Sequence, residues 1–134
     1  MATRREARER ALGLCYEIEA RGLTADEVLE EQLAPPDAYA VTLVRGVDAH
    51  RDEIDAVLAR YSEHWAVDRM PAVDRALLRI GVFELLWVDE IDDPVAITEA
   101  VELARTLSTD DSPRFLNGVL GRISDIAEHL RAAR

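Results

Sequence analysis

The sequence predicts an all-α protein of six or seven helices, and three observations lead to this fold class. Apolar residues recur at spacings of three and four along most of the chain, as on the buried face of a helix. Asp-Pro, Ser-Pro and Thr-x-x-Glu sequences, which are typical of helix starts, precede several of these stretches. No convincing alternating run of β-branched residues predicts a strand.

The first half of the chain is expected to form three helices. Residues 4–19 place apolar side chains on one face, at Ala7, Ala11, Leu14, Cys15 and Ile18. Thr24 and Glu27 form a capping box that starts a short helix, which ends before the two prolines at 35 and 36. Asp37 caps the next predicted helix, whose apolar stripe continues for about six turns to Tyr61, with Arg51 as an interruption.

The second half is expected to form the centre of the core. After a short helical turn at residues 67–70, Pro71 precedes a helix over residues 72–88 that is apolar around most of its circumference. Such a helix is central and largely buried. Asp93-Pro94 and Ser112-Pro113 start two further helices, with Ser112 or Asp111 as the cap of the second. The second of these is expected to continue to Leu130.

Length and composition predict one globular domain over residues 1–134, with a basic arm at residues 1–10. An apolar share of 49% is enough to fill a core, and no stretch approaches the roughly 18 apolar residues of a membrane span. The charged start does not resemble a signal peptide, so we expect a cytoplasmic protein that does not bind membranes. Cys15 is the single cysteine, which excludes an internal disulfide.

The sequence offers no catalytic or metal-binding constellation. It contains neither a P-loop nor a dinucleotide-binding glycine motif. Cys15 lies on an apolar stripe without a neighbouring base, and we interpret it as a buried structural thiol. The three histidines stand apart, and His50 with Glu53 is a single pair at helical spacing. We therefore expect no enzyme activity, no metal and no cofactor.

Two segments suggest binding functions. The net charge is −11, yet the first ten residues carry a net charge of +2, because four arginines there outnumber Glu6 and Glu9. Arginines bind phosphates and stack on unpaired bases, although an ordinary helix start would explain the same residues. The second segment, residues 108–120, places an aromatic residue and an interior glycine at a helix start. Such a start can receive RNA, or simply pack against a neighbouring helix.

Four sequence blocks together resemble one family. They are Arg5-x-x-Arg8 before Leu14-x-Tyr16, residues 74–80 with Phe83-Glu84-Leu85, residues 96–104, and residues 111–120. In this order and spacing they are similar to the NusB family of bacterial transcription antitermination factors, from Arg4 to about Ile123. The resemblance implies two packed helical bundles and a non-catalytic adaptor. It also implies binding to boxA-type single-stranded RNA of ribosomal RNA leaders, together with the small-subunit ribosomal protein NusE.

The same resemblance implies roles for individual residues. It assigns RNA contact to Arg4, Arg5, Arg8, Asp111, Phe115 and Asn117. It assigns contact with NusE to Tyr16, Asp74 and, more weakly, Asp68. Other Nus factors would connect the chain to the elongating RNA polymerase complex. Because Glu6 and Glu9 dilute the arm, we expect RNA binding to be weak without NusE.

Three alternatives stay open at this point. One is a purely structural use of the same fold. Another is an RNA-binding accessory domain of a ribosomal RNA methyltransferase, although 134 residues leave no room for that catalytic domain. The third is an acidic helical protein-interaction module without an RNA role, as the net charge suggests. The sequence is compatible with both a monomer and a homodimer.

Overall fold

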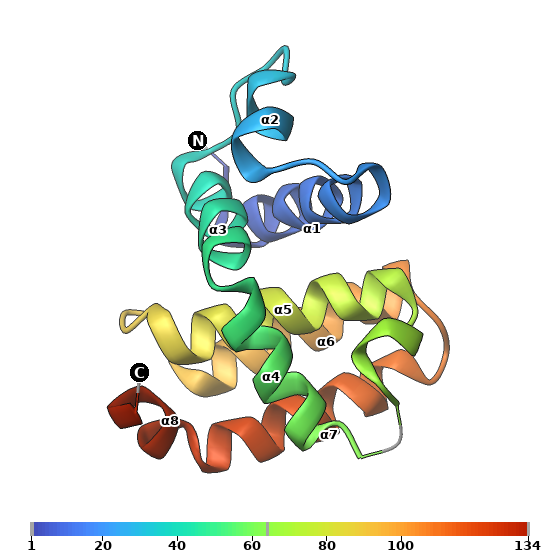
Figure 1. The fold of residues 1–134 in the computed structure, drawn as a ribbon, viewed down its shortest axis with the longest axis vertical. Coiled ribbons are helices and arrows are strands. Elements are labelled where there is room, and N and C mark those ends of the chain that lie inside the picture. Colours follow the sequence, from blue (N-terminus) through green and yellow to red (C-terminus); the bar gives the residue numbers. More distant parts are fainter. Residues whose placement is uncertain (1, 64, 134) are drawn as a thin grey trace.

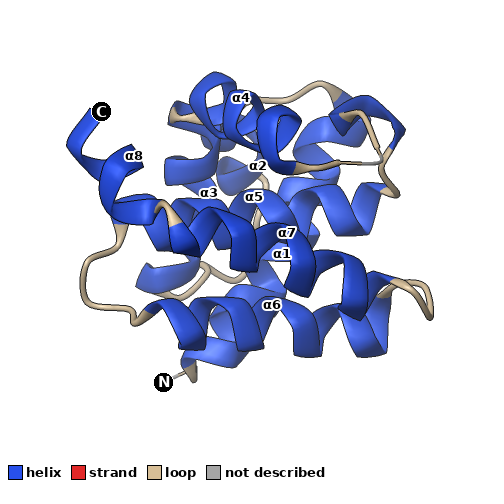
Figure 2. Ribbon diagram, turned by 90° about the horizontal axis from the view of Figure 1, so that it is seen from below, coloured by secondary structure: helices blue, strands red, loops and turns tan. Residues whose placement is uncertain are grey.

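The computed structural model describes residues 2–63 and 65–133, and Met1, His64 and Arg134 lie outside this description. The described residues form eight α-helices and one 3₁₀ turn without a strand, which confirms the all-α class (Figure 1, Figure 2). In chain order they are α1 (Arg4–Arg21), α2 (Ala25–Glu30), α3 (Ala38–Ala49), α4 (Arg51–Tyr61), η1 (Val67–Arg69), α5 (Ala72–Trp87), α6 (Asp93–Leu107), α7 (Ser112–Asp125) and α8 (Ala127–Ala133).

Local sequence signals account for most helix ends. Thr3 caps α1 and Thr24 caps α2, each in a reciprocal capping box with the glutamate three residues later. Gly22 ends α1 with a φ of 67°, a left-handed conformation that favours glycine. Prolines occupy the first turns of α6 and α7, as the sequence predicts.

Two predicted helices are each divided into two, which raises the count of described α-helices to eight. The helix expected from Asp37 to Tyr61 is interrupted at His50, whose φ of −109° and ψ of 18° separate α3 from α4. The division is needed because α3 packs on α1 whereas α4 packs on α7. The last predicted helix is likewise interrupted at Ile126, before α8. These boundaries correct the two predictions.

The helices form two packed groups that share α5. Figure 1 shows α1, α2 and α3 at one end of the molecule, with α4, α6, α7 and α8 at the other and α5 between them. Nearly every residue of α5 from Ala76 to Leu86 is buried, as expected for a central helix. At the crossing of α3 and α5, a Cβ on Gly46 would overlap the Phe83 ring, so this position requires glycine.

No helix in the described part of the chain is both long and apolar enough to cross a membrane. Within residues 2–63 and 65–133, no group of three or more His, Cys, Asp or Glu side chains is arranged to hold a metal ion. Cys15 is buried, and burial raises the pKa of its thiol to about 12. At neutral pH the thiol is therefore protonated and a poor nucleophile.

Candidate RNA and partner interface

The first turn of α1 presents two arginines that are exposed but already paired. Arg5 donates two hydrogen bonds to the Glu99 carboxylate on α6, at 3.1 and 2.6 Å. These bonds lower the pKa of Glu99, so its carboxylate is ionised at neutral pH. The Arg4 guanidinium lies 3.9 Å from the centroid of the Tyr39 ring and 3.4 Å from a Glu90 oxygen. Both arginines can reach an RNA phosphate only by leaving these partners.

Arg8 does not belong to the exposed arm. It is only 2% exposed, and its Nε donates to both oxygens of the buried Glu84 carboxylate, at 3.1 and 3.0 Å. The Tyr39 hydroxyl donates to the same carboxylate. The Arg8 guanidinium thus lies inside the protein, and direct RNA contact by Arg8, which stays a prediction, would require it to leave Glu84. This bond ties α1 to α5.

The first turns of α7 and the loop before them hold the other candidate RNA residues. Asp111 and Asn117 are exposed, whereas Phe115 is half-buried and packs edge-on against Trp65, with ring centroids 5.2 Å apart. A hollow of about 570 Å³ lies beside this aromatic pair. Asp111 occupies the capping position of α7, but its side chain makes no capping hydrogen bond. Asp111 is thus available for other contacts.

Asp74 is not a surface residue, contrary to its expected role in partner contact. It is only 1% exposed, and its carboxylate accepts hydrogen bonds from Ser108 and, at 2.9 Å, from Ser112. Ser112 also accepts a bond from the Thr109 N–H at 3.2 Å, inside the loop before α7. Asp74 therefore fastens the α6–α7 loop to the start of α5. A direct contact with a partner would require this cluster to open.

Tyr16 and Asp68 are both exposed and lie on either side of Glu19. Tyr16 borders a cavity of about 130 Å³ between α1 and α5, which Glu19 also lines. Asp68, on η1, borders a neighbouring hollow of about 910 Å³ that Glu19 lines from its other side. The structure thus brings these two candidate partner residues to one surface region, and it separates Asp74 from them.

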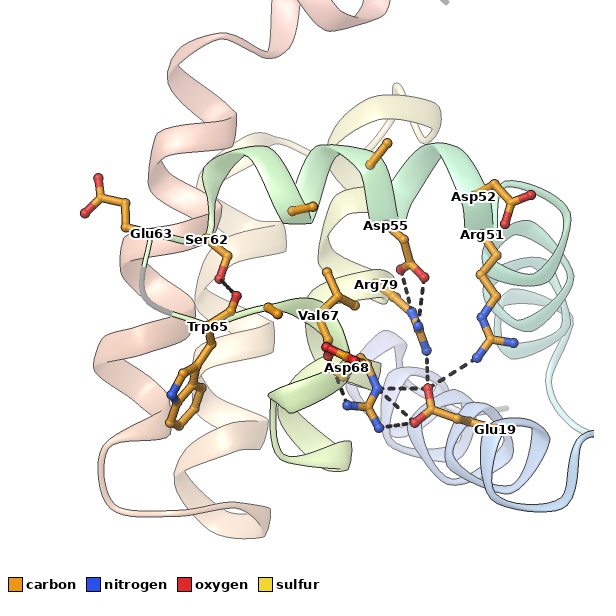
Figure 3. A pocket seen from close by; sticks show the side chains of 14 residues that line it. Glu19, Arg51, Asp52, Asp55, Ser62, Glu63, Trp65, Val67, Asp68 and Arg79 are labelled. Atoms are coloured by element: carbon orange, nitrogen blue, oxygen red, sulfur yellow. Dashed lines mark hydrogen bonds and ion pairs between the residues drawn. The ribbon is translucent and has the colours of Figure 1, made fainter.

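Glu19 itself is a site residue that sequence reasoning missed. Its carboxylate accepts hydrogen bonds from Arg75 Nε at 2.8 and 2.9 Å, from Arg51 at 3.2 Å, and from Arg79 (Figure 3). Arg79 also donates to both oxygens of Asp55, at 2.8 and 2.9 Å. The bonds from Arg75, followed by those from Arg79, lower the pKa of Glu19 to about 2. The one sequence signal was the pair of arginines, Arg75 and Arg79, in a helix that is apolar around most of its circumference.

The two groups of candidate RNA residues lie at different ends of α6. The arginines of the first turn contact residues before and in the first half of α6, through Glu90 and Glu99. Asp111 and Phe115 lie beyond its other end, where the chain turns into α7 (Figure 2). An RNA strand that touches both groups would therefore run along α6.

Comparison with known proteins places this arrangement in context. Residues 5–125 match the NusB family. The transcription antitermination protein NusB of Salinispora arenicola is 57% identical over 134 residues, which cover 95% of this chain and 98% of that protein. The solved structure of T. maritima NusB matches with a TM-score of 0.86 at 31% identity, covering 99% of both chains.

A second solved structure contains other molecules. A NusB chain in a complex of antitermination factors NusB and NusE with double-stranded RNA matches with a TM-score of 0.78 at 29% identity. That match covers 91% of this chain and 96% of the other. Sequence and fold agree over nearly the whole length. The chain therefore belongs to the NusB family.

Proposed function

We propose that this chain is a non-catalytic RNA-binding adaptor in transcription antitermination. It binds boxA-type RNA of ribosomal RNA leader transcripts together with NusE, in the cytoplasm, and other Nus factors connect it to elongating RNA polymerase. Membership of the NusB family and the likeness to a NusB–NusE–RNA complex support this proposal. The alternative of an accessory methyltransferase domain receives no support from these similarities.

One observation carries the RNA-binding part. Two exposed arginines, Arg4 and Arg5, begin α1 on a protein whose net charge is −11. They pair with Glu90, before α6, and with Glu99, on α6, the helix that leads to Asp111 and Phe115. A local cationic strip is sufficient to position a phosphate backbone, whereas aromatic and polar side chains contact the bases. Arg8 serves this surface indirectly, by fixing the first turns of α1 against α5.

The partner surface has a different electrostatic character. Tyr16 offers an exposed aromatic ring, and Asp68 offers an exposed carboxylate on the other side of Glu19. Aromatic residues are frequent in the centres of protein interfaces, and an acidic surface attracts a basic ribosomal protein such as NusE. Asp74 lies apart from this surface and holds the α6–α7 loop from inside the protein.

The first experiment measures RNA affinity in the presence of NusE as a function of salt. Changing Arg4 and Arg5 together to alanine should weaken binding and lower the magnitude of the salt slope by about 0.7 for each phosphate that is no longer neutralised. Arg21→Ala with Arg45→Ala is the matched control, because these arginines are also exposed and ion-paired but lie at the other end of α1 and on α3. An equal weakening in both double variants would show a general charge effect and contradict the arm assignment.

The second experiment measures NusE capture. Tyr16→Ala and Asp68→Ala should weaken capture and leave the melting temperature nearly unchanged, because both side chains are exposed. Leu33→Ala is a suitable control, since Leu33 is fully exposed on another segment. Full capture by both variants would move the partner surface elsewhere.

A second candidate function is an acidic protein-interaction module without an RNA role. The ion pairs of Arg4 and Arg5 with Glu90 and Glu99 favour it, because they occupy both arginines in the free protein. The salt experiment separates the two candidates. If the chain is only a protein-interaction module, the unaltered protein should capture NusE but bind RNA no more tightly than the Arg4 and Arg5 double variant does.

A further inference from the structure

Trp65 is an exposed aromatic residue to which the sequence resemblance assigns no role. It lies between α4 and η1 and is 43% exposed. Its position is defined by its backbone, because the buried Ser62 donates a hydrogen bond to the Trp65 carbonyl at 2.8 Å. Figure 3 shows the indole pointing away from the Glu19 cluster. It faces Phe115 of α7 instead, with an interplanar angle of 63°.

The hollow beside these rings combines the groups that bind a nucleotide. Its volume of about 570 Å³ falls in the range of small-molecule sites, roughly 300–1,000 Å³. Arg114 lines it, is exposed, and makes no hydrogen bond or ion pair with any described residue, so it is available for a phosphate. Asp111 lines the rim and can accept a bond from an exocyclic amino group.

Three further charged side chains line the hollow: Glu63, Asp74 and Arg122. The Asp74 carboxylate is only 1% exposed, and it already accepts hydrogen bonds from Ser108 and Ser112. Glu63 lies 3.8 Å from the Arg122 guanidinium, which offsets its negative charge. Arg122 also donates to the Tyr61 carbonyl at 3.1 Å, which holds the end of α4 against α7. The two aromatic walls therefore come from separate segments that are fastened together. A rigid aromatic pair binds a base with little loss of conformational entropy.

We propose that the hollow beside Trp65 and Phe115 binds one unpaired base of single-stranded RNA, with Arg114 contacting the adjoining phosphate. This inference rests on the proposed RNA-binding function and extends its surface from α7 to the α4–η1 segment. The base stacks on the exposed indole face, as bases stack on aromatic platforms of single-strand binding proteins. The alternative occupant is a side chain of NusE.

The test uses the two tryptophans of the chain as probes. The chain is labelled with 5-fluorotryptophan, bound to unlabelled NusE, and titrated with a single-stranded boxA-type oligoribonucleotide. The ¹⁹F resonance of Trp65 should shift as RNA is added, whereas that of Trp87 should stay. Trp87 is the internal control because it lies on a different part of the molecule. Its ring stacks on that of His50, with the two ring centroids 4.4 Å apart. A Trp65→Phe variant assigns the two resonances.

Affinity measurements complete the test. Trp65→Ala should weaken RNA binding of the NusE complex by about fivefold or more, because the base can no longer stack on an aromatic ring at this position. The salt slope should stay unchanged, since the indole carries no charge. Trp65→Phe should retain most of the affinity. Leu33→Ala, at an exposed apolar residue between α2 and α3, should have no effect.

Two results would overturn the proposal and leave the RNA-binding function intact. One is unchanged affinity of Trp65→Ala while the Arg4 and Arg5 double variant binds RNA more weakly. The other is a Trp65 resonance that shifts when NusE is added and not when RNA is added, which would assign the hollow to the protein partner. Absence of RNA binding by the unaltered NusE complex would instead contradict the proposed function itself.

Discussion

Arg8 and Asp74 are charged residues that lie inside the protein, although their sequence positions match residues expected at binding surfaces. Each meets a complementary group on α5 or on the loop before α7: Arg8 meets Glu84, and Asp74 meets two serines. A buried charge whose partner is removed is strongly destabilising. The effect of changing either residue should therefore appear first in stability.

Arg8→Ala should lower the free energy of unfolding by about 3–5 kcal/mol, because it leaves the Glu84 carboxylate buried without its cation. Arg5→Ala is the matched control. Its side chain is 60% exposed, so water already solvates it and its removal should change the stability far less. Urea unfolding followed by circular dichroism measures both. If Arg8→Ala proves as stable as Arg5→Ala and binds RNA more weakly, Arg8 is a contact residue after all.

Asp74→Ala should lower the free energy of unfolding by about 1–3 kcal/mol, because it removes the buried acceptor of Ser108 and Ser112. Asp68→Ala, at an exposed aspartate of η1, should change it by less than about 0.5 kcal/mol. Thermal melting distinguishes the two variants. If Asp74→Ala melts at the normal temperature but fails to capture NusE, Asp74 contacts the partner directly and is not mainly a structural residue.

At the level of elements, the sequence predicts helix starts better than helix breaks. A helix start depends on a few neighbouring residues, so it can be predicted from the sequence. The structure confirms the helices predicted to start at Thr24, Asp93-Pro94 and Ser112-Pro113. The break at His50 has no proline and no capping side chain, and its one sign in the sequence is Arg51, which interrupts an apolar stripe that resumes in α4. The chain turns there for a tertiary reason, the docking of α3 and α4 on different neighbours.

The candidate site shows the same limit. Helical periodicity indicates which residues share a face, but it does not show which side chain of another helix lies opposite. Arg5 and Arg8 are only three residues apart, yet one is exposed and the other is enclosed by Tyr39 and Glu84. Trp65 has no sequence signal for a related reason, since its aromatic partner is fifty residues further along the chain.

The Glu19 cluster joins α1 to α4 and α5, and it should make stability depend on pH. Arginine contacts lower the pKa of Glu19 from near 4.5 to about 2. A lowered pKa contributes stability that is complete above the unfolded value and disappears as the pH falls through the folded value. The contribution of Glu19 should therefore fade between pH 4.5 and 2.

Glu19→Gln tests this contribution. The variant should be less stable at pH 7 by about 1–3 kcal/mol, and the difference from the unaltered protein should shrink as the pH is lowered toward 2. Urea midpoints across this range measure it. Glu17→Gln is the control, because Glu17 lies on the same helix and is half-exposed. If Glu19→Gln remains less stable than the unaltered protein by the same amount near pH 2, the lost stability does not come from the ionised Glu19 carboxylate.

At the scale of the whole molecule, acidic residues pair with the two arginines that we propose contact RNA. Glu99 holds Arg5 through two hydrogen bonds. Glu99→Gln should free Arg5, raise RNA affinity, and steepen the salt slope by up to about 0.7 for one further phosphate neutralised. Glu128→Gln on α8 removes the same charge away from the arm. An equal rise in affinity for both variants would point to net charge alone and contradict a specific restraint.

The central position of α5 has a consequence for how the protein opens. Three of its charged residues bond to other elements. Asp74 accepts hydrogen bonds from the loop before α7 and from the start of α7. Arg79 donates to α4 and α1, and Glu84 accepts from α1 and α3. Neither helical group can detach without exposing the apolar surface of α5 and separating one of these pairs. Partial unfolding of one group alone is therefore disfavoured. The amides of α5 should exchange with deuterium only when the entire chain unfolds, and binding at either end should slow this exchange along the whole helix.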